Sequence, residues 1–212
     1  MSTVLTIPFI KGIFKFELTQ KTKQMDLLTP KYLTKKMAQE AVKLAVNTVL
    51  GTLPVKRQHC HVVVLVPALT VSKVMPYPKN YGLEYELLHE ESFKDGTDWA
   101  HDYEEIAQCK AIQLIHARNL GGSQLATPVH LLYPGDTPFW GGDVIEDIVV
   151  TCSGVQPHFD KLISRIAAST MIAMAKEAWE NSKDKELDRD FLLEGEEPDV
   201  PKIEAGPWPF SD

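Results

Sequence analysis

The chain has 212 residues, enough for one large domain or two small ones, and its 44% hydrophobic and 24% charged residues are ordinary for a globular protein. Its net charge of −7 is confined to residues 180–212, which hold eleven acidic and four basic residues, whereas the other residues hold 18 of each sign. A neutral body without a basic stripe argues against nucleic-acid binding, whose affinity comes largely from contacts to phosphate.

The sequence also argues against membrane insertion, secretion and disulfide or zinc chemistry. No apolar run of about 18 residues occurs, so we expect no membrane span and no membrane partner. The first twenty residues alternate apolar and charged side chains, which indicates structure and not a secretory signal. Three cysteines without a CxxC pair argue against a disulfide framework or a cysteine zinc site. We therefore expect reduced thiols and a cytoplasmic protein.

The N-terminal part of the chain predicts strands and then a helix. Residues 4–18 are mostly apolar and broken by Pro and Gly, which is typical of one or two strands. Thr29 suits a helix N-cap, Pro30 suits the first helical position, and Gly51 lies just past the last periodic residue. Apolar residues at helical spacing lie between them, so a helix is expected there.

The middle of the chain predicts two strands and a second helix. The β-branched run in residues 59–69 is typical of a central strand, which we expect to end at Pro67. Residues 70–78 predict the next strand, and residues 79–97 a connector with one short helix. Helical spacing returns over about 98–118, before a Gly-rich stop.

The last third predicts a short strand within 127–138, another strand at about 145–152, and a third helix over 157–180. This helix is apolar around most of its circumference, which predicts packing against both its own sheet and a neighbouring subunit. The element order predicts an α+β domain whose antiparallel sheet carries helices on its faces.

Three segments follow from this order. Residues 1–26 form an N-terminal strand extension, residues 27–180 the main domain, and residues 181–212 an acidic, Pro- and Trp-containing tail. The composition of the tail predicts flexibility in an isolated subunit. Its two apolar stretches, 191–193 and 208–210, are suited to anchor it on the body or on a partner.

Paired glycines and a Ser-Gly bracket one predicted strand. Gly141 and Gly142 precede it, and Ser153 and Gly154 follow it. Glycine there permits positive φ or the close approach of another backbone or a ligand. Turn geometry alone explains the pattern; the alternative is that Gly141, Gly142 and Ser153 line a ligand pocket.

Histidines and acids supply the other candidate groups. His59 and His61 lie two apart on the predicted strand and so face the same side, which permits a joint ligand role, although no third metal ligand is evident. In the segment "DWAHDYEE", His101 and Asp102 are suited to acid–base catalysis, or equally to an exposed helix start. Arg118 is suited to clamp a carboxylate or to cap a helix.

Two stretches resemble the GlcG/HbpS-like family of heme-binding, glycolate-locus-type proteins. The stretch "IAQCKAIQLIHARNLGG" is similar to the family helix in which a Lys-Ala pair, here Lys110 and Ala111, begins a run of small and apolar residues. The stretch "FWGGDVIEDIVVTCSG" is similar to the family's GG, strand, SG signature. The resemblance covers about residues 27–180 and implies a profilin-like fold, a homodimer or larger ring and, in some members, bound heme.

Three hypotheses for function follow. The first is an oligomeric ligand-binding protein of this type, whose ligand is heme or a small carboxylated metabolite. The second is a cofactor-independent enzyme on the same scaffold, a lyase, isomerase or cyclase that uses His101, Asp102 and Lys110 for acid–base chemistry. The third is a structural or interaction module that acts through its acidic tail. The sequence contains no GxSxG, P-loop, GxGxxG or HExxH motif, which removes the best evidence for hydrolase-triad, nucleotide-binding and zincin functions.

Overall fold

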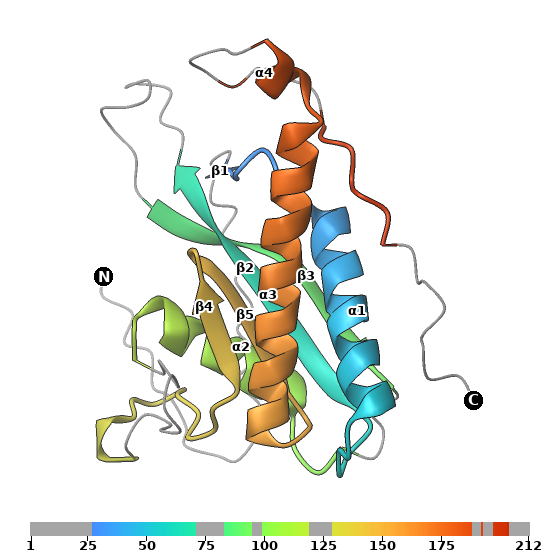
Figure 1. Ribbon diagram of the computed structural model, residues 1–212. Helices are drawn as coiled ribbons and strands as arrows, with labels where there is room; N and C mark the ends of the chain where they lie inside the picture. The colour runs from blue at the N-terminus through green and yellow to red at the C-terminus, as the bar shows by residue number, and fades with distance from the viewer. Residues whose placement is uncertain are drawn as a thin grey trace, which may run out of the picture.

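The computed structural model describes residues 27–70, 83–94, 99–118, 129–187, 192 and 197–203. An antiparallel sheet lies between two helical layers (Figure 1), which confirms the predicted α+β class. Helices α1 (Lys35–Thr52) and α3 (Pro157–Glu180) cover one face, and α2 (Tyr103–Ile115) covers the other. The strands expected over 4–18 lie outside the described residues. Within those residues no helix combines the length and apolar character needed to cross a bilayer.

Strand β2 (Cys60–Thr70) is the centre of the sheet. It pairs with β3 (Leu83–Phe93) along one edge, and with β1 (Leu27–Leu28) and β5 (Ile148–Ser153) along the other. Strand β4 (Gly142–Ile145) pairs with β5. Alternation along β2 serves both layers, because Val62 and Val64 pack toward α1 and α3 while Val63 packs toward α2.

Helix α1 begins later than predicted, and it includes Gly51, which we had expected just past its end. Thr34 is its N-cap, and the Oγ1 of Thr34 accepts a hydrogen bond from the backbone N–H of Met37 at 3.2 Å. The Thr29 cap was therefore wrong: the carbonyl of Pro30 accepts from the N–H of Leu33 in a separate turn. Both threonines satisfy the capping preference, and the periodic apolar face selects Thr34 because it starts at Met37.

The connector expected over 79–97 is mostly strand β3. Its acidic and apolar residues alternate over 84–87, and pairing with β2 converts that alternation into an edge strand. Strand β2 also continues through Pro67, which we had expected to end it. Pro67 is tolerated because the pairing of β2 with β5 stops at Leu65, so no β5 partner requires an N–H at that position. The strand expected over 70–78 lies outside the described residues except for Thr70.

Further along the chain, local details differ from expectation while the element order holds. Helix α2 starts at Tyr103 instead of about 98, and a short 3₁₀ turn, Val129–Leu131, replaces the strand expected within 127–138. The strand expected at 145–152 is a hairpin, β4 to β5, whose two turn residues Glu146 and Asp147 have φ of 46° and 64°. Positive φ at both central residues matches the twist of a tight hairpin. Helix α3 begins at Pro157 as predicted.

The start of the predicted tail packs on the body. A short helix, α4 (Lys183–Glu186), follows α3, and its Asp184 is buried. Asp184 accepts hydrogen bonds from Lys31 Nζ at 2.6 Å and from the Tyr32 hydroxyl at 2.5 Å. The expected flexibility therefore does not extend to this first turn of the tail, because a buried carboxylate requires such partners.

The backbone requires glycine at position 154, directly after β5, and this generates a stability prediction. Gly154 has φ of +132°, and a Cβ there would lie 2.7 Å from the carbonyl oxygen of His59. We expect Gly154→Ala to lower the free energy of unfolding by about 2 kcal/mol or more, because strain and a clash combine. Gly51→Ala is the matched control, since nothing lies within 4 Å of its Cβ position. Urea unfolding checks both, and equal effects would contradict the prediction.

Candidate functional site

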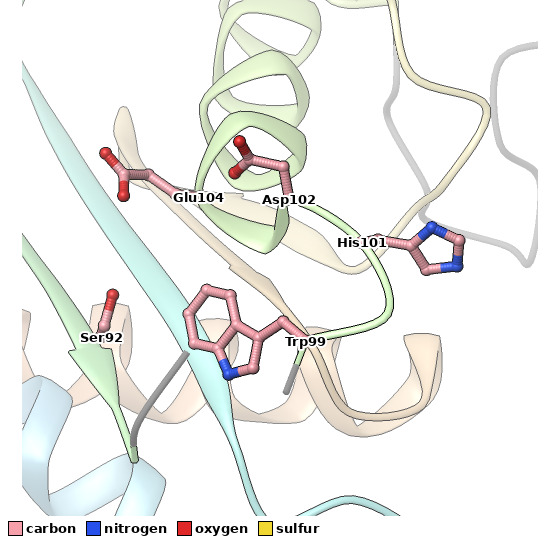
Figure 2. A pocket seen from close by; sticks show the side chains of 5 residues that line it. All are labelled: Ser92, Trp99, His101, Asp102 and Glu104. Carbon is pink, nitrogen blue, oxygen red and sulfur yellow. The ribbon is translucent and has the colours of Figure 1, made fainter. Parts of the chain in front are cut away.

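A pocket of about 440 Å³ lies where the end of β3 meets the start of α2 (Figure 2). Figure 2 shows the Trp99 indole extending toward Ser92, with the carboxylates of Asp102 and Glu104 near it and His101 pointing away. Asp102 is the N-cap of α2, since its Oδ1 accepts from the N–H of Glu105 at 3.0 Å. The cap ends the loop that carries Trp99, and so the helix start determines the shape of the pocket. Its lining residues are Ser92, Trp99, His101, Asp102 and Glu104.

Aromatic rings pack behind the pocket. The Trp99 ring centroid lies 5.7 Å from that of His59 and 5.3 Å from that of Tyr103. Tyr103 is 3% exposed. Among the described residues, the His59 Nε2, the Trp99 Nε1 and the Tyr103 hydroxyl have no hydrogen-bond partner. Buried polar atoms without partners are rare, and each one calls for a functional or structural explanation.

His61, on β2, contacts the lining residue Ser92 but does not itself line the pocket. The strand register places it between Ser92 on β3 and Ser153 on β5. Its Nδ1 lies 2.7 Å from the Ser92 Oγ, within hydrogen-bond distance. Its Nε2 lies 3.8 Å from the Glu90 Oε2, which is too long for a hydrogen bond, and has no partner among the described residues. The side chain is only 4% exposed.

Burial favours the neutral form of both His61 and His59, which directly precedes β2. It lowers the pKa of His61 below its ordinary value of 6.5, and the opposing attraction of Glu104, Glu90 and Asp102 is smaller. Burial also lowers the pKa of His59, with a further contribution from the nearby cations Arg57 and Lys94. The imidazole of His61 is therefore uncharged at neutral pH and does not neutralise the carboxylates around it.

The structure brings together two sets of residues that the sequence separates by about forty positions. His59 and His61 face α2, and the start of α2 supplies Asp102 beside them. Sequence reasoning missed Ser92, which lay in a segment taken for a connector. Period-two alternation in 84–87 was the available signal, since it indicates a strand that pairs with β2. Trp99 and Glu104 lay within the acidic segment but had no assigned role.

Lys110 lies away from the pocket. It is 1% exposed, and its Nζ donates to the Cys152 carbonyl at 2.8 Å and to the Asp160 Oδ2 at 3.4 Å. The other Asp160 oxygen, Oδ1, accepts from the Val155 N–H at 3.0 Å. Burial raises the pKa of Asp160, although Lys110 opposes that shift. The pair joins α2 to the start of α3 around the end of β5.

Gly141, Gly142 and Ser153 are packed closely by the residues around Lys110 and Asp160. A Cβ on Gly141 would lie 2.5 Å from the Asp160 Cβ, and one on Gly142 would lie 2.6 Å from the Leu114 Cδ1. Ser153 is 3% exposed, on β5. Neither these glycines nor Ser153 is among the residues that line the Trp99 pocket. Their geometry supports the turn and packing interpretation over the pocket interpretation.

Arg118 follows the end of α2 and holds a loop. Its guanidinium contacts both carboxylate oxygens of Asp136, one of them at 2.8 Å. Its Cζ also lies 5.2 Å from the centroid of the Tyr133 ring. The Arg118 hydrogen bonds hold the pKa of Asp136 below its usual range. The sequence had suggested that Arg118 clamps the carboxylate of a ligand. In the structure the carboxylate of Asp136 occupies that position instead.

The described part of the chain contains no arrangement of side chains suited to bind a metal ion. Within those residues, no group of three or more His, Cys, Asp or Glu side chains is placed to hold an ion. The pair His59 and His61 therefore remains without a third ligand there.

Comparisons with known proteins add no relative. The chain matches no protein-family model, no curated protein and no solved structure. The resemblance to the GlcG/HbpS-like family therefore remains a prediction from short motifs.

The buried pair of Lys110 and Asp160 generates a second stability prediction. We expect Lys110→Met to lower the free energy of unfolding by about 3–5 kcal/mol, because it leaves the Asp160 carboxyl buried without its cation. Adding Asp160→Asn removes that charge and is expected to restore part of the loss. Lys176→Met is the control, since Lys176 pairs with Glu146 at 3.8 Å on the surface. Urea unfolding at pH 7 measures all four proteins, and equal losses for the two lysine variants would contradict the structure.

The neutral state of His61 predicts a pH dependence. Its folded-state pKa lies below its unfolded value of 6.5, so its contribution to stability is present above pH 6.5 and is lost as the pH falls through the folded pKa. His61→Gln removes this proton uptake and should flatten the slope by up to about 1.4 kcal/mol per pH unit. Urea midpoints at several pH values between 5 and 8 measure it. A difference between wild type and variant that does not change with pH would refute the assignment.

Proposed function

We propose that the chain binds a small polar ligand in the Trp99 pocket. The observation that carries the proposal is the Nε2 atom of His61, which is buried and has no partner among the described residues, on a side chain that contacts the lining residue Ser92. A buried acceptor or donor without a partner costs free energy that a bound polar group recovers. The Trp99 ring supplies an apolar surface beside it, and a few polar groups beside an aromatic face are typical of small-molecule sites.

The ligands implied by the family resemblance fit this pocket less well. Asp102 and Glu104 line it, and their charges oppose the propionates of heme or the carboxylate of a metabolite. The Nδ1 of His61 is held by Ser92, and the side chain is only 4% exposed, so a group as large as heme cannot approach it for axial ligation. The five lining residues include no Lys or Arg to bind a carboxylate.

The acid–base enzyme receives less support than ligand binding. Of its three residues, Asp102 and His101 line the pocket, but the His101 imidazole points away from the other lining side chains, and the Lys110 ammonium is buried against Asp160. General acid–base catalysis requires the participating groups within hydrogen-bond reach of one substrate. Assembly into a homodimer or ring also stays a prediction, based on the family resemblance and the apolar circumference of α3.

Filling the pocket tests the proposal. We expect small polar metabolites (amines, carboxylates and polyols) to include some that shift the Trp99 indole and Glu104 amide signals in ¹H–¹⁵N NMR spectra of the full chain. Ser92→Trp places a large ring in the pocket and should abolish those shifts. Ser169→Trp is the matched control, because Ser169 is exposed on α3, which covers the opposite face of the sheet.

Thermal unfolding establishes that both tryptophan variants fold. The proposal fails if no metabolite shifts the pocket signals in the wild-type chain. It also fails if Ser169→Trp removes the shifts as completely as Ser92→Trp does, since the binding would then not depend on the pocket.

A further inference from the structure

We infer that the Trp99 pocket selects a compact organic cation, a protonated amine or a guanidinium group. The inference rests on the proposed function, because it assigns the chemical class of the ligand to the same site. Three kinds of observation carry it: the carboxylates at the pocket, the buried imidazole behind them, and the aromatic face between.

Carboxylates dominate the charge at the pocket. Asp102 and Glu104 line it, and the Glu90 Oε2 lies 3.8 Å from the Nε2 of His61, which contacts the lining residue Ser92. Arg57 and Lys94 are the nearby cations, and they lie on the His59 side: the Arg57 Cζ is 6.0 Å from the Tyr103 ring centroid, and Lys94 donates to Gln58. The lining itself therefore presents negative charge that a bound cation would balance.

The imidazole of His61 is the second, independent observation. When its Nδ1–H donates to the Ser92 Oγ, the buried Nε2 becomes an acceptor without a donor among the described residues. An ammonium or guanidinium group carries several N–H donors and no acceptor, so it supplies a donor to Nε2. The Glu90 Oε2 already accepts from the Gln108 Nε2 at 3.3 Å, so Glu90 contributes only its charge. A carboxylate ligand offers acceptors only and leaves Nε2 unsatisfied.

The Trp99 ring adds a face suited to cations. It lines the same pocket as Asp102 and Glu104, whose carboxylates lie across the pocket from the ring in Figure 2. Tryptophan is the aromatic side chain that attracts cations most strongly, and the attraction adds to that of the neighbouring acids. The ring also contacts the apolar part of an organic amine, which a hydrated metal ion does not possess.

The start of helix α2 is the feature that would favour an anion, and its acids offset that preference. Exposed N–H groups and the helix dipole attract negative charge there. Asp102 already accepts from the Glu105 N–H, and Glu104 and Glu105 lie in the first turn. The chain's own carboxylates thus occupy the position that an anionic ligand would take.

Three probes with the same ring and different charge test the inference. Benzylamine is a cation at neutral pH, benzyl alcohol is neutral and benzoate is an anion. NMR titration of the full chain measures each dissociation constant from the Trp99 indole and Glu104 amide signals. We expect benzylamine to bind most tightly and benzoate most weakly, and added salt to weaken benzylamine binding.

A matched pair of variants separates the pocket charge from the general charge of the helix start. Glu104→Gln should weaken benzylamine binding about fivefold while leaving benzyl alcohol unchanged, because it removes a carboxylate that lines the pocket. Glu105→Gln removes the same charge from the next residue, which does not line the pocket, and should change binding less than about twofold. Equal effects of the two variants would overturn the inference.

The outcomes distinguish this inference from the proposed function. If benzoate or benzyl alcohol shifts the pocket signals at concentrations as low as benzylamine requires, the ligand class is wrong and the pocket still binds ligands. If neither these probes nor the metabolite set shifts the pocket signals, both the inference and the proposed function fail.

Discussion

The buried ion pair between Lys110 and Asp160 holds the two helical layers in one geometry. Lys110 comes from α2 on one face of the sheet, and Asp160 comes from the start of α3 on the other. Between them lies the end of β5, whose Cys152 carbonyl accepts from the same ammonium. A buried charge requires its partner at close range, so the position of α2 along the sheet is strongly constrained. The chain segments approach so closely around this pair that a Cβ on Gly141 would lie 2.5 Å from the Asp160 Cβ, which explains the glycine at that position.

That constraint reaches the candidate site through α2. The N-terminus of the helix carries Asp102 and Glu104, and two turns further on Lys110 is held in place. The pairing of β2 with β3 supplies the other wall, where His61 meets Ser92. The pocket is therefore formed between two elements of the fold whose relative position the core determines, which is the condition for groups that must be oriented before a ligand arrives.

Local signals in the sequence predicted the fold class and the three long helices, and they were weakest for the strands, whose positions depend on tertiary contacts. Helix α3 begins at Pro157 as its sequence indicates, because the first helical position tolerates proline. Strand β3 was taken for a connector, since its alternation acquires meaning only through pairing with β2. Lys110 was expected to need a partner, but Asp160 lies 50 residues away and no local pattern points to it. The same holds for His61 and Ser92, which are 31 residues apart.

Two groups of acids differ in the described part of this chain: those that are buried with a cation beside them, and those at the pocket, whose lining residues include no Lys or Arg. Asp160 and Asp184 are buried with cations beside them, Lys110 and Lys31, and both serve the fold. At the pocket the carboxylates Glu90, Asp102 and Glu104 surround an imidazole that burial keeps uncharged, so the protein supplies no matching positive charge from that group. If these acids served stability alone, a protonated histidine or a lysine at the position of His61 would balance them better. The neutral imidazole leaves their attraction available to a cation from outside the chain, so the inferred ligand class and the pH dependence of stability rest on the same group.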